Sequence, residues 1–149
     1  MKTFLIRFFI LTLFLFTCSK EKKGVIIKQE LLDIIKSTVR DYEEATTLDD
    51  LKFNPDVYEV RFQRENEQCY LLIISNNYYN TEFDATISID DNLVVFYNLN
   101  SDCNRMVAVN KKADIVDLSK FDNETNALND YHPKIWKFKI ENRKFIFIE

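Results

Sequence analysis

The sequence predicts an α+β fold in which one N-terminal amphipathic helix packs on a curved antiparallel sheet of about six to seven strands. Three observations lead to this class. Apolar residues first recur every three or four positions, which is typical of a helix, and later alternate with polar residues, which is typical of half-buried strands. Short polar segments separate the alternating stretches, so most strands should be joined as antiparallel hairpins.

The helix is expected from Val25 to about Thr46. Its apolar stripe consists of Ile27, Leu31, Ile34, Ile35, Val39 and Tyr42. Charged residues such as Lys36 and Arg40 fall on the opposite side. An isolated helix with such a stripe is not stable in water, so the stripe needs a partner surface, and the sheet that follows can supply it.

The strands are expected after Asp56. They are built on YEVRFQ (58–63), CYLLIIS (69–75), ATISID (85–90), LVVFYN (93–98), RMVAVN (105–110), IWKFKI (135–140) and KFIFIE (144–149). In the first, Tyr58, Val60 and Phe62 should face the core while the residues between them face water. The continuous apolar run of the second favours a central strand covered on both faces.

Two local features complete the strand prediction. Asp91-Asn92 is a short turn signal between two strands. Trp136 is interpreted as a core residue, because Phe138 and Ile140 continue its period of two.

The N-terminal segment carries an export signal. Lys2 and Arg7 precede an apolar run from Phe8 to Thr17, which is too short to cross a hydrocarbon core of about 30 Å, and the run leads directly into Cys18. This ending resembles the lipobox of bacterial lipoproteins, in which the cysteine is acylated and the peptide before it is removed. A signal anchor or a plain secretory peptide with a chance cysteine is the alternative.

The lipoprotein resemblance implies a signal peptide over residues 1–17, a lipid on Cys18 and a short membrane tether over 18–24. Residues 25–149 then form a single domain. The resemblance also implies a place in the bacterial cell envelope, on the outer membrane in a diderm, facing either the periplasm or the cell surface. The membrane is then bound through acyl chains, which hold a protein there almost permanently.

With Cys18 assigned to lipid, Cys69 and Cys103 remain as a candidate disulfide. An exported domain lies in an oxidising compartment, where such bonds persist. Two buried free thiols are one alternative, and a redox pair or a thiolate metal site is another. The sequence has no C-x-x-C motif and only one histidine. Both facts disfavour a redox pair or a thiolate metal site.

Composition excludes several function classes. Gly24 is the only glycine, and phosphate-binding loops and dinucleotide fingerprints need several, so we expect no nucleotide. The chain has a net charge of −4 and no dense basic stripe, so we expect no nucleic acid. His132 is the only histidine, which excludes a two-histidine metal site. We therefore expect neither a metal nor a cofactor.

Aromatic residues supply the candidate binding surface. Some lie between two predicted strands and others near the end of the long segment from Leu118 to Pro133. Exposed aromatic side chains are common anchors of protein interfaces, although the same residues could instead be buried in the core. The candidate surface consists of Tyr78, Tyr79, Phe83, Tyr131 and His132.

These observations predict a non-enzymatic envelope lipoprotein that binds a partner protein, as an accessory subunit or an inhibitor. The first alternative is a module that binds a small hydrophobic or glycan ligand in a pocket between helix and sheet. The second is a hydrolase that uses His132 with a nearby acid, Asp122 or Asp130.

Overall fold

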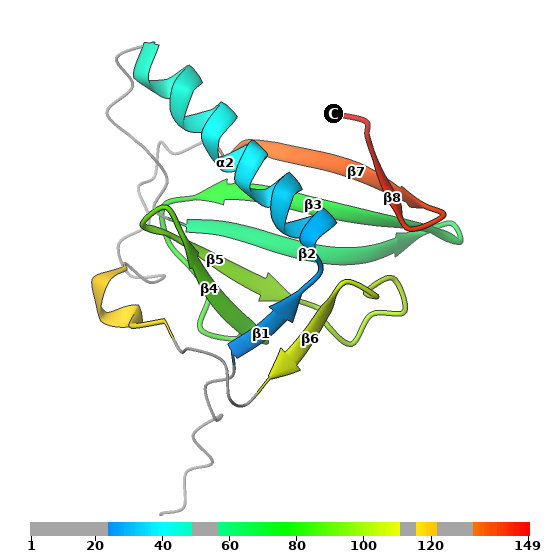
Figure 1. Cartoon of the computed structure of the whole chain (residues 1–149). Coiled ribbons are helices and arrows are strands. Elements are labelled where there is room, and N and C mark those ends of the chain that lie inside the picture. The colour runs from blue at the N-terminus through cyan, green and yellow to red at the C-terminus, as the bar shows by residue number, and fades with distance from the viewer. Residues whose placement is uncertain (1–23, 49–56, 111–115, 122–132) are drawn as a thin grey trace, which may run out of the picture.

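A computed structural model describes residues 24–48, 57–110, 116–121 and 133–149 of the chain (Figure 1). This part of the chain forms one α-helix, one short 3-10 helix and eight strands. The helices are α2 (Gln29–Leu48) and η1 (Leu118–Lys120). The strands are β1 (Gly24–Ile27), β2 (Val57–Glu65), β3 (Gln68–Asn76), β4 (Ala85–Ile89), β5 (Asn92–Tyr97), β6 (Val107–Asn110), β7 (Ile135–Glu141) and β8 (Lys144–Phe147).

Six strands form one open sheet in the order β4-β5-β2-β3-β7-β8, and α2 lies across one face of it (Figure 1). The α+β class is therefore confirmed. The sheet is mixed, however, because β2 pairs with β5 in parallel, whereas the other pairs are antiparallel. The β4–β5 hairpin packs against the edge of β2 through β5. In this position β5 runs parallel to β2. The sheet is also not strongly curved, contrary to the prediction.

The helix is not the first element of the domain. It starts at Gln29, and the residues before it form β1, which pairs with β6 in a separate two-stranded ribbon. The backbone N–H of Lys28 also donates to the carbonyl of Met106 at 2.9 Å. The predicted start at Val25 was wrong because Ile27 precedes Leu31 by four residues and so fits the helical stripe, although it belongs to a strand.

The main core lies between α2 and the sheet. Leu31, Ile35 and Val39 of the helix are buried and pack on strand residues such as Phe62 and Ile73, so the predicted stripe is confirmed. Trp136 is also a core residue as predicted. Within the described ranges, no helix is long and apolar enough to cross a membrane.

A second, smaller core covers the opposite face of the sheet. It is centred on Val57, Leu93 and Val95, and side chains from outside the sheet pack against it: Phe83, Val116, Leu118 and Phe121. Glu59 lies on this face and pairs with Val95, and it is buried although the alternation predicted that it would face water. On β3, in contrast, Leu72 and Ile74 are only half-buried, so β3 is central but not fully covered on both faces.

The two cysteines of the described residues are joined. Cys69 at the start of β3 is disulfide-bonded to Cys103 in the segment before β6, with their Cα atoms 5.4 Å apart. The disulfide interpretation is therefore confirmed over the two free thiols. The bond fixes the segment between β5 and β6 to the end of the β2–β3 hairpin.

Three hairpins turn through left-handed residue pairs without glycine. The pairs are Asn66-Glu67, Asp90-Asp91 and Asn142-Arg143, each with two positive φ values between 46° and 66°. Such two-residue type I′ turns favour Asn, Asp and especially Gly, because a Cβ atom strains this conformation. The turn predicted at Asp91-Asn92 lies one residue earlier, and Asn92 begins β5.

Replacing Glu67 by glycine is expected to stabilise the domain by about 1 kcal/mol, since glycine removes the left-handed strain at φ 66°. The midpoint of chemical unfolding measures the effect. The matched control is Ser88→Gly in the extended strand β4, which should instead destabilise by about 0.5–1 kcal/mol. Destabilisation by both substitutions would contradict the argument from turn strain.

Candidate functional site

A groove of about 440 Å³ lies between α2 and the last two strands. One wall is the side of the helix, and the floor is the inner face of β7 and β8. Its lining residues are Asp33, Ile34, Ser37, Thr38, Asp41, Trp136, Phe138 and Phe147.

The groove exists because one helix cannot cover six strands. Strands lie about 4.8 Å apart and a helix is about 10 Å wide, so α2 covers roughly two of them. The β1–β6 ribbon lies beside β4 and covers the other end of the inner face. The inner face of β7 and β8 is left partly open, and the Phe147 side chain there is 59% exposed.

The floor of the groove is aromatic. The ring of Phe147 meets that of Phe138 edge to face, with centroids 5.5 Å apart, while Trp136 packs in the same way against Tyr42 of the helix at 5.5 Å. The ammonium of Lys134 lies 5.0 Å from the Trp136 ring. An exposed phenylalanine on a rigid apolar floor favours binding of another apolar surface.

The helical wall adds a negative rim. Asp33, Ser37 and Asp41 occur at intervals of four residues, so they follow one side of α2. Asp33 accepts a hydrogen bond from the side-chain amide of Gln29 at 2.7 Å. The groove therefore combines an apolar floor with two carboxylates along one wall.

The structure describes only part of the predicted aromatic surface, namely Tyr78, Tyr79 and Phe83. Tyr79 belongs to the second core and is 6% exposed, and its ring lies 6.2 Å from that of half-buried Phe83. Tyr78 is half-buried. Tyr131, His132 and the lipidation candidate Cys18 lie outside the described residues. The structure therefore does not bring these residues together into one described site.

Sequence reasoning did not identify the groove as a site, since it named Ile34, Trp136 and Phe138 only as core residues. The signal for the rim was present, because acidic and hydroxyl residues recur every four positions beside the apolar stripe of α2. Phe147 gave no separate signal. It lies in a continuous apolar run with Ile146 and Ile148, which only predicts a strand.

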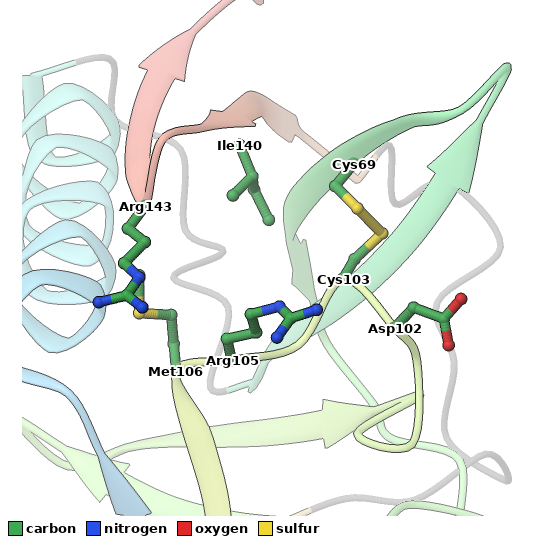
Figure 2. Close-up of a pocket in the computed structure, with 7 residues that line it drawn as sticks. All are labelled: Cys69, Asp102, Cys103, Arg105, Met106, Ile140 and Arg143. Atoms are coloured by element: carbon green, nitrogen blue, oxygen red, sulfur yellow. A yellow bond between two sulfur atoms is a disulfide. The ribbon is translucent and has the colours of Figure 1, made fainter.

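A second hollow of about 360 Å³ lies beside the disulfide. Figure 2 shows Arg105, from the segment before β6, and Arg143, from the β7–β8 turn, around a floor that includes Met106 and Ile140. Both arginines are exposed, and neither forms an ion pair with a carboxylate of the described residues. The hollow has positive charge but no buried polar group that would orient a ligand.

The most buried ionic group lies on the opposite face of the sheet. Glu59 accepts hydrogen bonds from Arg61 Nε at 2.9 Å and from the buried Asn76 side chain at 3.1 Å. The Arg61 guanidinium also stacks over the Tyr97 ring at 4.8 Å. Because these partners already engage the carboxylate, the group holds β2, β3 and β5 together rather than offering a free acid or base.

One lysine on this outer face has a perturbed pKa. The Lys137 ammonium donates to Glu65 at 2.9 Å, and this hydrogen bond raises the pKa of Lys137 above its ordinary value of 10.5. Since a raised lysine pKa favours the folded state only while the lysine is protonated, this contribution is lost at strongly alkaline pH. Among the described residues, no three His, Cys, Asp or Glu side chains gather as metal ligands do.

Comparison with known proteins adds no relative. Neither a family model, nor a curated protein, nor a solved structure matches this chain. Its function must therefore be argued from the site itself.

Proposed function

We propose that the chain is a lipoprotein of a bacterial cell envelope, held to its membrane by a lipid on Cys18, whose domain binds a partner protein in the groove. The observation that carries the binding proposal is the exposed Phe147 on an apolar floor beside two carboxylates. Protein interfaces are commonly centred on such an aromatic anchor with a polar rim.

The envelope location is supported by two independent features. The apolar run from Phe8 to Thr17 ends at Cys18 in the manner of a lipobox. The Cys69–Cys103 bond is of the kind that persists in oxidising compartments outside the cytoplasm. Gly24 already begins β1, so a tether over residues 18–23 would reach only about 20 Å and the domain would lie close to the membrane surface.

A binding role is favoured over a catalytic one. The buried carboxylate of Glu59 is already engaged by Arg61 and Asn76. The carboxylates of the groove line its rim and leave an apolar floor, an arrangement that suits recognition.

The second candidate is a small hydrophobic ligand in the same groove. Its volume of about 440 Å³ falls within the range of about 300–1,000 Å³ that is typical of ligand pockets. A protein partner is favoured because ligand pockets enclose most of their ligand, whereas Phe147 on this floor is 59% exposed.

The test is mild chemical crosslinking of the tagged full-length chain in native membranes, followed by affinity capture and mass spectrometry. We expect to recover one partner in an amount nearly equal to that of the chain itself. The Cys18→Ala variant should leave the membrane fraction and no longer capture this partner. Phe147→Ala should reduce its recovery about tenfold, because truncating a central anchor costs more than 1 kcal/mol.

Ile135→Ala is the matched control for the groove variant. Ile135 is 49% exposed, comparable to Phe147. It pairs with Ile74 and directly precedes the inward-facing Trp136, so its side chain lies on the outer face of the same sheet. Recovery should be unchanged. Capture of the chain alone, or equal losses from both variants, would count against a protein partner in the groove.

A further inference from the structure

We infer that the groove receives an amphipathic α-helix of the partner, with basic residues along the edge that faces α2. This inference rests on the proposed function, since it specifies the segment that a partner protein would insert. It follows from the dimensions of the groove, the spacing of its carboxylates and the protection of the adjacent sheet edge.

The open part of the inner face lies at β8, the edge strand next to β7. Trp136 and Phe138 of β7 are already buried in the core with α2, whereas Phe147 of β8 is 59% exposed. Two helices packed side by side have axes about 8–10 Å apart. A helix lying next to α2 over the edge of the sheet would therefore cover Phe147, whose ring already packs on Phe138.

The carboxylates of the rim match such a helix in spacing and sign. Asp33 and Asp41 are eight residues apart on α2, which is about 12 Å at 1.5 Å per residue. Lysine or arginine residues seven or eight positions apart on a second helix recur on one side at nearly the same distance. A basic edge would pair with both carboxylates, while an acidic edge would be repelled.

The edge of the sheet itself is protected against addition of a strand. β8 is only four residues long, starts at Lys144 and ends in a bulge. In the bulge, the N–H groups of Ile148 and Glu149 approach the carbonyl of Lys137 at 2.9 and 3.5 Å, and the N–H of Lys137 donates to Glu149 at 2.6 Å. Short, bulged edge strands with lysine resist pairing with another chain, so a helix is the better occupant.

A second copy of the chain is disfavoured as the occupant. If two such grooves met face to face across a two-fold axis perpendicular to α2, Asp33 and Asp41 of each would approach those of the other, and with an axis parallel to α2 these carboxylates would face β8 and gain no cation from the groove. Like charges at an interface oppose association. A small apolar molecule would supply no cation to either carboxylate.

The experiment compares two synthetic helical peptides that differ only in charge. Both carry the same leucine face, and the residues along one edge are lysine in the first and glutamate in the second. Binding to the full-length chain in phosphatidylcholine nanodiscs is followed by fluorescence anisotropy, with empty nanodiscs as the baseline. We expect the lysine peptide to bind at least about tenfold more tightly and to gain helical circular dichroism on binding.

Two variants locate the binding in the groove. Asp41→Lys should abolish the preference between the peptides, because the new lysine offsets the charge of the remaining carboxylate, Asp33. Glu82→Lys, the same change of charge at an exposed position in the segment before β4, should leave the preference unchanged. Phe147→Ala should weaken both peptides about tenfold, and the side chain is exposed enough for this variant to fold.

Equal affinity for the two peptides, a preference that survives Asp41→Lys, or binding without a gain of helix would each overturn the inference. These outcomes are distinguishable from failure of the proposed function. If membrane crosslinking still recovers a partner through Phe147, the proposed function stands and only the basic helix is wrong. If the peptides behave as expected but membranes yield no partner, the proposed function fails.

Discussion

Replacing Cys69 and Cys103 together by alanine is expected to lower the free energy of unfolding by about 4 kcal/mol. The bond joins residues 34 positions apart, and a loop of this length restricts the unfolded chain strongly in the chain-entropy model. Loss of this amount removes a large part of the stability of an ordinary domain, which is about 5–15 kcal/mol.

Denaturant unfolding of the full chain in detergent, with and without a thiol reductant, measures this effect. The reductant should destabilise the natural chain to the level of the double variant and leave the double variant unchanged. Cys18→Ala is the matched control, since it removes a cysteine without touching the bond. An equal loss in that control, or a double variant as stable as the natural chain, would contradict the role given to the disulfide.

Arg61→Ala is expected to destabilise the domain by about 3 kcal/mol, because it leaves the buried carboxylate of Glu59 without its cation. The Glu59 side chain is only 6% exposed, and the Arg61 side chain that covers it is 40% exposed, so Arg61→Ala removes the main cation of a poorly hydrated carboxylate. Loss of the stacking contact between Arg61 and Tyr97 adds to the effect. Thermal and denaturant unfolding provide the measurement.

Two further variants separate charge from packing. Arg61→Ala combined with Glu59→Gln should recover about 1 kcal/mol or more, since the uncompensated charge is removed while the hydrogen bond to Asn76 can be kept. Arg64→Ala is the control, because its ion pair with Asp102 is exposed on both sides and should contribute at most about 0.5 kcal/mol. A loss for Arg64→Ala as large as that for Arg61→Ala would refute this explanation.

Local patterns predicted most of the elements. The stripe of Leu31, Ile35 and Val39 predicted the helix, because the same side of every turn must be buried. The polar turns at Asn66-Glu67 and Asn142-Arg143 predicted their hairpins, since the strands that they join are adjacent in the chain. The oxidising environment implied by Cys18 led to the pair Cys69 and Cys103.

Strand pairings between distant segments could not be predicted from the sequence in the same way. The pairing of β1 with β6 and of β2 with β5 depends on segments far apart in the chain, and neither strand of a pair carries a mark of its partner. Burial of Glu59 involves neighbours from other strands, such as Asn76 of β3 and Val95 of β5. A pocket between helix and sheet was among the alternatives, but its position over β7 and β8 follows from strand order, which alternation alone does not encode.

The order of strands in the sheet has a consequence for how the domain folds. The β2–β3, β4–β5 and β7–β8 hairpins are local and can form within microseconds. The pairs β2–β5 and β3–β7 join segments distant in the chain, and such contacts slow folding to milliseconds or longer. Because β7 and β8 supply the floor of the groove, the groove is completed only when this last hairpin docks on β3. Under the proposed function, a chain caught before that step would already have its central hairpin but would lack the surface for its partner.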